Sequence, residues 1–304
     1  MRLCPAIALS AALVGLPACT PASSDADAVH MSVFDMKIEK VRGGGFSAID
    51  ISADGRRFIA VTDDSYFIEG RITRHGGWIV GLEWSEITRL PRKLMPKDPL
   101  KEALDSEGIT YLPKGGFAVS YEVSHDLRVY RTATDLPTTL PLPPDTEVLK
   151  PNGSFEALAA DARGHLYILP ERSGQLTEPL PVHRFDGTSW STPYHIPRRG
   201  GFLPVGADIL AGQLYVLERE FNGLAFRSRV RRFDMETDAL GGESTLLATP
   251  WGRHGNLEGL AVWRDADDGL RFTMISDDNG LTFMRSEMVE YVIDEALANK
   301  GAGL

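Results

Sequence analysis

Five segments of the chain share one pattern, and this internal repeat limits the possible folds more than any other feature of the sequence. Each segment begins with a small or acidic residue, continues as an alternating apolar strand, turns, and ends as a second apolar strand followed by acidic residues. The segments cover residues 46–65, 106–122, 155–172, 206–220 and 257–278. Their starts lie roughly 50 residues apart, which is the spacing of β-propeller blades.

Each segment is typical of a β-hairpin, because residues that tolerate positive φ angles separate its two apolar runs. These turn residues are Asp54-Gly55, Gly115-Gly116, Arg163-Gly164, Gly212 and Asp268-Gly269. One or two weaker strands follow each hairpin, so each repeat has the four strands of a blade. The sequence therefore predicts an all-β fold, a β-propeller of five four-stranded blades, with a six-bladed ring as the alternative.

The two ends of the repeat array predict how the ring closes. The fifth repeat ends after residues 288–294, one strand short, and an unassigned strand at residues 33–41 precedes the first repeat. We expect this N-terminal strand to join the C-terminal blade, because closure removes the exposed sheet edges. Residues 32–304 then form a single propeller domain.

The N-terminus has the features of an export signal. Arg2 precedes an apolar run at residues 6–16, and Cys19 follows small residues. A basic start, a short apolar core and a small-residue cleavage site describe a signal peptide. We expect residues 1–18 to be that peptide, Cys19 to be lipidated as in a bacterial lipobox, and residues 19–31 to be a flexible tether. Thr20 after the Cys favours the periplasmic face of the outer membrane; an incidental Cys and a soluble periplasmic protein are the alternative.

Charge restricts the partners. The chain has 32 Lys and Arg residues against 42 Asp and Glu residues, a formal net charge of −10. No basic cluster is available to neutralise a phosphate backbone, which argues against a nucleic-acid partner. We expect a monomer that contacts the membrane only through its lipid anchor and binds a small anionic substrate or ligand.

Acidic residues gather where a propeller would bring them together. The starts of the first strands and the ends of the second strands surround one channel mouth. The first set is Glu107, Glu156, Asp208 and Glu258, with Ser47 in the remaining repeat, and the second is Asp63, Asp64, Glu122, Glu171, Glu218, Glu220, Asp277 and Asp278. Because converging carboxylates repel one another and calcium takes irregular oxygen ligands, we predict a Ca²⁺ site formed by Glu107, Glu156, Asp208 and Glu258. Carboxylates that serve structure, or that share protons without a metal, are the competing interpretations.

Basic residues at the same mouth complete the predicted site. We assign catalytic roles to Glu107, Glu258 and His254, and substrate binding to Arg172, Arg219, Asp277 and Asp278. A cation, carboxylates and arginines together suit metal-assisted attack of water on an anionic ester. The chain has no Gly-x-Ser-x-Gly elbow, no phosphate-binding Walker loop and no His-Glu-x-x-His motif, which excludes the serine hydrolases of the α/β type and the common zinc proteases.

Two stretches resemble a known family. LEREF at residues 217–221 and NLEGLAV at 256–262, followed by SDDN at 276–279, are similar to the bacterial "esterase-like activity of phytase" domain family. The resemblance runs from about residue 44 to residue 280, and Ala48 stands where that family tends to have Gly. It implies ester or phosphoester hydrolysis by a phytase-like propeller. A non-catalytic ligand-binding propeller and a calcium-dependent lactonase remain alternatives.

Overall fold

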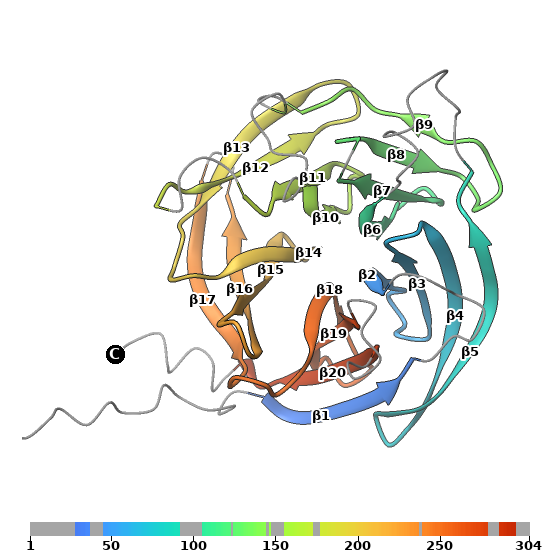
Figure 1. Ribbon diagram of the computed structural model, residues 1–304, viewed down its shortest axis with the longest axis vertical. Coiled ribbons are helices and arrows are strands. Elements are labelled where there is room, and N and C mark those ends of the chain that lie inside the picture. The colour runs from blue at the N-terminus through green and yellow to red at the C-terminus, as the bar shows by residue number, and fades with distance from the viewer. Residues whose placement is uncertain are drawn as a thin grey trace, which may run out of the picture.

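The computed structural model is a closed ring of five four-stranded antiparallel sheets, which Figure 1 shows along the ring axis. It describes residues 28–36, 45–91, 105–122, 124–143, 146, 155–172, 177–236, 239–278 and 286–295. Every secondary-structure element assigned within these residues is a strand. The predicted all-β fold and the count of five blades are confirmed, and the six-bladed alternative is wrong.

The strands follow the chain from the centre of the ring outward within each blade. Blade 1 contains β2 (Phe46–Ile51), β3 (Arg57–Thr62), β4 (Tyr66–His75) and β5 (Trp78–Arg89). Blade 2 contains β6 (Ser106–Tyr111), β7 (Phe117–Tyr121), β8 (Leu127–Tyr130) and β9 (Thr138–Thr139). Blade 3 contains β10 (Phe155–Ala160), β11 (Leu166–Pro170), β12 (Leu180–Phe185) and β13 (Trp190–Ile196). Blade 4 contains β14 (Leu203–Leu210), β15 (Gln213–Phe221), β16 (Phe226–Met235) and β17 (Leu240–Ala248).

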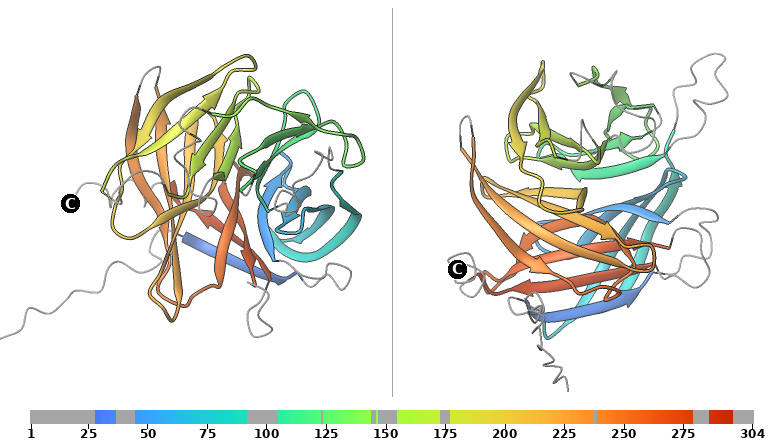
Figure 2. Two further views of the ribbon diagram at one scale, coloured as in Figure 1. Left: turned by 45° about the horizontal axis from the view of Figure 1, so that its top comes forward. Right: turned by 60° about the vertical axis from the view of Figure 1, so that its left-hand side comes forward.

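Blade 5 joins the two ends of the chain. It contains β18 (Asn256–Arg264), β19 (Leu270–Asp277) and β20 (Glu287–Ile293), and β1 (Ala28–Asp35) is its outermost strand. Strands β1 and β20 are antiparallel, with Val33 opposite Val289. Figure 2 shows β1 in blue beside the red strands of blade 5 from two further sides. The predicted N-terminal closing strand is present, although it begins at Ala28, inside the segment predicted as tether.

The hydrophobic core consists of five clusters, one between each pair of neighbouring blades. Both faces of a blade are therefore covered, and the inner strands are buried on both sides. The innermost strands contact one another in the ring order β2, β6, β10, β14, β18 and back to β2. This arrangement holds the first residues of all five inner strands around one opening.

A register shift near the start of each inner strand decides which side chain reaches that opening. The shift skips one residue of the inner strand in every blade: Ser47, Glu107, Glu156, Val205 and Glu258. A small residue follows each of them, Ala48, Gly108, Ala157, Gly206 or Gly259. A Cβ on Gly206 would lie 2.5 Å from the Glu258 backbone oxygen, so the small residue permits the next blade to approach. Such bulges re-aim single side chains, and in blades 2, 3 and 5 the re-aimed residue is a glutamate at the channel mouth.

The predicted signal peptide, Cys19 and residues 20–27 of the predicted tether lie outside the described residues. Among the residues that the structure describes, no helix is long and apolar enough to span a bilayer.

Candidate functional site

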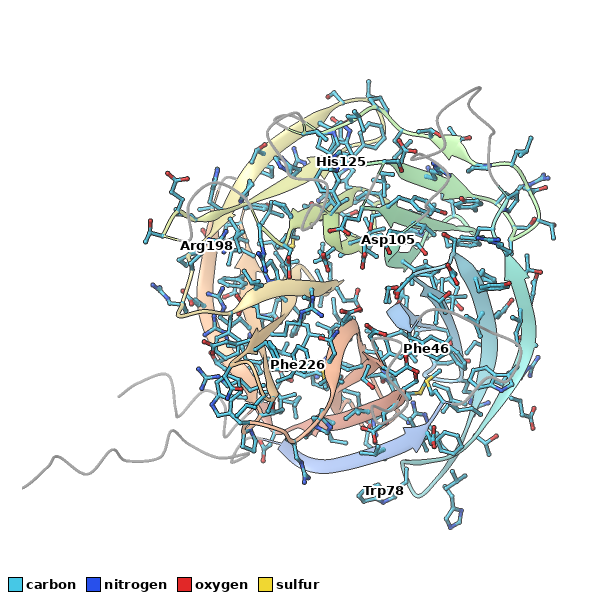
Figure 3. All side chains as sticks on the ribbon, in the orientation of Figure 1. Phe46, Trp78, Asp105, His125, Arg198 and Phe226 are labelled. Atoms are coloured by element: carbon cyan, nitrogen blue, oxygen red, sulfur yellow. The ribbon has the colours of Figure 1, made fainter. Side chains whose placement is uncertain are left out.

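One mouth of the channel is a charged cavity of about 450 Å³. Its lining consists of eight carboxylates and two arginines: Asp63, Asp105, Glu107, Glu122, Glu156, Glu171, Glu258 and Asp277, with Arg172 and Arg219. Asp105 is labelled near the centre of the ring in Figure 3. Blades 1, 2, 3 and 5 supply the carboxylates, whereas blade 4 supplies Arg219. First-strand starts and second-strand ends converge at this mouth for seven of the twelve predicted carboxylates, whereas Asp64, Asp208, Glu218, Glu220 and Asp278 do not line it.

The blade 2 side of the cavity holds the tightest group of acids. Asp105, Glu107 and Glu122 each offer a carboxylate oxygen, and these oxygens all lie within 4.8 Å of one another. Burial, followed by Glu122 and Asp63, raises the pKa of Asp105 to about 6. Burial, followed by Glu156 and Glu258, raises the pKa of Glu107 well above its ordinary value. The main influences on these two carboxyls therefore all disfavour the ionised state.

The opposite side of the cavity differs because Arg219 offsets its carboxylates. Its Nη1 donates to Glu258 Oε1 and to Asn256 Oδ1 (2.5 Å), and its Nη2 lies 3.4 Å from Glu171 Oε1. Burial raises the pKa of Glu258 to about 8 although Arg219 opposes the rise. Burial and Glu171 raise the pKa of Glu156 well above its ordinary value, again against Arg219. Burial thus disfavours the ionised form of Glu258, while its contact with Arg219 favours that form.

The structure does not bring Asp208 to this mouth, so the predicted four-residue ligand set is not assembled. Asp208 lies three residues beyond the bulge of β14, and the residue equivalent to Glu107 and Glu258 is Val205. Asp208 accepts hydrogen bonds from the backbone N–H groups of Ile209 (2.7 Å) and Val262 (2.6 Å), which links β14 to β18 of the next blade. Asp50 links β2 to β6 in the same way, through Tyr111 N (2.6 Å). Both carboxylates connect blades.

His254 and Asp278 also lie outside the lining of the cavity. His254 is buried, and its Nε2 is 2.6 Å from the hydroxyl of Tyr291 on β20. Burial, with a smaller contribution from Arg253, lowers the pKa of His254 to about 4. The ring is therefore neutral at neutral pH. Asp278 accepts from Ser286 Oγ at 3.1 Å.

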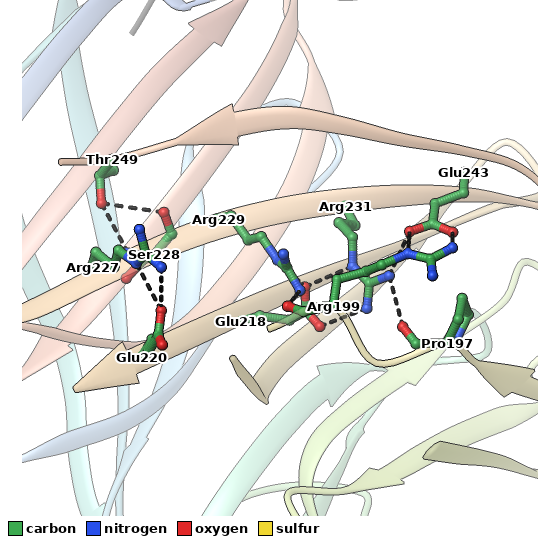
Figure 4. Close-up of polar contacts among 10 residues, drawn as sticks. All are labelled: Pro197, Arg199, Glu218, Glu220, Arg227, Ser228, Arg229, Arg231, Glu243 and Thr249. Atoms are coloured by element: carbon green, nitrogen blue, oxygen red, sulfur yellow. Dashed lines mark hydrogen bonds and ion pairs between the residues drawn. The ribbon is translucent and has the colours of Figure 1, made fainter. Parts of the chain in front are cut away.

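Glu218, expected at the mouth from its place late in the second strand, points outward into blade 4. It is 1% exposed and accepts from Arg231 at 2.6 and 2.7 Å and from Arg229 at 2.6 Å, as Figure 4 shows. Glu220 pairs instead with Arg227. These acids stabilise blade 4 and leave Arg219, which alternates with them along β15, to face the cavity.

Arg172 and Asp277 do line the cavity, whereas Asp64 is not among its lining residues. Arg172 keeps 61% of its side chain exposed while its Nε donates to Glu171 at 3.1 Å. Asp277 is the last residue of β19 and is buried. Asp105 is the residue that sequence reasoning missed, and the signal was its position directly before β6, next to Ser106-Glu107. The small residue after each bulge was a second signal, since aligning Gly206 with Gly108 and Gly259 makes Val205, and not Asp208, the counterpart of Glu107 and Glu258. Val205 packs into the core between blades 4 and 5.

The carboxylate oxygens on the blade 2 side of the cavity fit a hard divalent cation. Oxygen ligands bind Ca²⁺ at roughly 2.4 Å, so ligand atoms of one ion lie no more than about 4.8 Å apart. The oxygens of Asp105, Glu107 and Glu122 meet this limit. The three residues come from one blade, in contrast to the four blades expected.

Fold and site together define a class: a five-bladed β-propeller whose channel opens into a carboxylate-lined cavity. Within that class the chain belongs to the phytase-like family described as "Esterase-like activity of phytase", whose model matches residues 41–280. This confirms the resemblance found in the sequence. No curated protein matches the chain significantly.

Several solved structures share the fold at low sequence identity. An α-L-arabinofuranosidase from Podospora anserina in complex with cellotriose aligns with a TM-score of 0.52 at 11% identity, over 85% of this chain and 94% of that one. An exo-β-1,3-galactanase from Phanerochaete chrysosporium gives 0.53 at 10% identity, over 88% of this chain and 65% of that one. A luciferin-regenerating enzyme gives 0.50 at 11% identity, over 88% and 96%. These similarities concern the propeller fold alone.

Proposed function

We propose that the protein is a divalent-cation-dependent hydrolase of small anionic esters or phosphoesters, with Ca²⁺ as the ion, and that the acid-lined mouth is its active site. The observation that carries the proposal is the imbalance of charge: eight carboxylates face two arginines, and one of these, Arg219, is already paired with Glu258 and Glu171. A bound cation would favour the ionised form of these carboxyl groups and offset their repulsion of an anionic substrate. The family membership supports an enzyme of ester chemistry.

In this proposal Asp105, Glu107 and Glu122 hold the ion, in place of the set predicted from the sequence, which was Glu107, Glu156, Asp208 and Glu258. A bound cation would polarise an ester oxygen and make water a better nucleophile. Glu258, with a pKa of about 8, donates a proton to the leaving oxygen. Arg172 presents an exposed guanidinium to an anionic group of the substrate. Asp277, which also lines the mouth, contributes to substrate binding.

The location is proposed from the sequence. The signal peptide at residues 1–18 and Cys19 support an exported lipoprotein on the periplasmic face of the outer membrane, with a soluble periplasmic protein as the alternative. Strand β1 begins at Ala28, so residues 20–27 would form the whole connection between a lipidated Cys19 and the ring. We propose a monomer without a nucleic-acid partner.

The test is hydrolysis of p-nitrophenyl phosphate, p-nitrophenyl acetate and a chromogenic lactone by the purified soluble part, with Ca²⁺ and with EDTA. We expect turnover that EDTA abolishes and that Glu107→Gln and Glu122→Gln remove. Glu83→Gln is the matched control, because Glu83 is an exposed carboxylate on β5, the outermost strand of blade 1. We expect Ca²⁺ at 100 times its Kd to stabilise the fold by about 2.7 kcal/mol, and the two mouth variants to lose this gain.

A second candidate is a non-catalytic propeller that binds a cationic ligand. The same excess of carboxylates favours it, since a cationic group needs no metal to enter the mouth. No turnover of any substrate, together with a melting temperature that Ca²⁺ does not change, would overturn the hydrolase and favour this candidate. Turnover of the lactone alone would assign the site to the lactonase alternative.

A further inference from the structure

A second cavity, of about 460 Å³, adjoins the acidic mouth. Glu171, Arg172 and Arg219 line both cavities, so the two share a wall. The second cavity otherwise lies over blade 4 and is lined by Phe202, Leu203, Phe221 and Phe226, with Arg198 at its edge. We call it the aromatic groove. A polar mouth and an apolar groove thus form one continuous, two-part depression.

The rings of the aromatic groove are held in place by their neighbours. Phe221 and Phe226 face each other across the end of the β15–β16 hairpin, with ring centroids 4.6 Å apart. The guanidinium groups of Arg227 and Arg229 lie 4.8 and 4.0 Å from the ring centroid of Phe202. Arg227 is in turn fixed by Glu220. Because these contacts set the ring positions before any ligand arrives, the groove is preorganised for binding.

Exposure at this place points to a ligand. Phe221 is 55% exposed at the end of β15, two residues beyond Arg219, which holds the register position that Asp63, Glu122, Glu171 and Asp277 hold in the other blades. The lining combines four apolar side chains with five charged ones, and the volume lies within the range of small-molecule pockets, where apolar surface binds the ligand and polar groups orient it.

We propose that the aromatic groove binds an apolar, ring-sized group of the substrate, so that the preferred substrates are aryl esters or aryl phosphoesters whose anionic part enters the acidic mouth. The substrate class rests on the proposed function, whereas binding of the ring in the groove does not depend on turnover. Arg172 and Arg219 stand where the two parts of such a molecule would join. Phe221 and Phe202 are then specificity-determining residues.

The experiment measures binding of three probes to the soluble protein by calorimetry or ligand-observed NMR: 2-naphthyl phosphate, methyl phosphate and 2-naphthol, the phosphates in the presence of Ca²⁺. Phe221→Ala removes half of an aromatic pair at the groove. We expect it to weaken 2-naphthyl phosphate and 2-naphthol about threefold to tenfold and to leave methyl phosphate unchanged. Leu224→Ala is the matched control, since Leu224 is 93% exposed on the same hairpin and does not line the groove.

The outcomes separate this inference from the proposed function. Ring binding that depends on Phe221, without turnover of any ester, supports the groove and overturns the hydrolase. Turnover that EDTA abolishes, with equal rates for aryl and methyl phosphoesters and no effect of Phe221→Ala or Phe202→Ala, overturns the groove and leaves the hydrolase. Equal binding of 2-naphthol to the parent protein and to Phe221→Ala also overturns it.

Discussion

The ion network in blade 4 provides a sharp test of the structure. Arg231 donates from Nε and Nη2 to the two carboxylate oxygens of Glu218 at 2.7 and 2.6 Å, and from Nη1 to Glu243 at 2.7 Å and Pro197 O at 3.0 Å. The side chains of Arg231 and Glu218 are both 1% exposed. Arg231→Met removes the cation and keeps most of the apolar side-chain volume.

The expected cost follows from what Glu218 retains. Breaking a buried ion pair by removing one partner costs about 3–5 kcal/mol, because the other charge stays buried without compensation. Arg229 remains 2.6 Å from Glu218 and compensates part of that charge, so we expect the lower end, about 3 kcal/mol. For a domain of this size the melting temperature would fall by roughly 6–12 °C.

Urea unfolding followed by tryptophan fluorescence measures this loss. Arg199→Met is the control: Arg199 also pairs with Glu243, but it is 57% exposed, so its loss should cost less than about 1 kcal/mol. The double variant Arg231→Met/Glu218→Leu should recover most of the stability, because an apolar pair can replace a buried ion pair. A loss below about 1 kcal/mol for Arg231→Met, or a double variant less stable than the single one, would refute the reasoning.

Three further predictions concern the pH dependence of folding and the link between blades. In the folded protein the pKa of Glu258 is about 8, above its ordinary value of 4.5. In EDTA the free energy of unfolding of the parent protein should therefore fall by up to about 5 kcal/mol relative to that of Glu258→Gln as pH rises from 4.5 to 8. A difference between the two proteins that does not vary with pH would contradict this. In the folded protein the pKa of His254 is about 4, below its ordinary value of 6.5. The free energy of unfolding of the parent protein should therefore fall by about 3 kcal/mol relative to that of His254→Gln as pH falls from 6.5 to 4. The pH profile of activity should be the same in both proteins. Asp208→Ala leaves the N–H groups of Ile209 and Val262 without their acceptor, so it should lower the free energy of unfolding, measured with urea, by roughly 2–6 kcal/mol. The Ca²⁺ affinity should not change. A weaker Ca²⁺ affinity would show that Asp208 belongs to the ion site.

Local patterns predicted the ring and the position of its acidic mouth. Turn chemistry was sufficient for the hairpins, as at Ala211 and Gly212, whose φ angles of 52° and 77° form the tight turn between β14 and β15. Propeller geometry then placed Glu107, Glu156 and Glu258 together, because all three occupy the same bulge in their blades.

The errors have a common physical cause. In blade 4 the bulge residue is Val205, which carries no charge, so the nearest carboxylate, Asp208, was taken in its place. His254 precedes β18 in the sequence, but its ring turns into the core to reach Tyr291. The side of the strand that Glu218 occupies depends on the β15 register. Contacts that join distant strands, such as Arg219 with Glu171, have no local sequence signature.

The closure of blade 5 constrains when this chain can fold. Strand β1 is synthesised first, but its partner β20 lies almost at the other end of the chain. Until that last strand emerges, both β1 and β19 have unpaired edges, and the last blade is incomplete. Pairing over such a sequence separation is slow, because a large loop must close before the contact forms. The ring would therefore close only after the C-terminal segment has been synthesised.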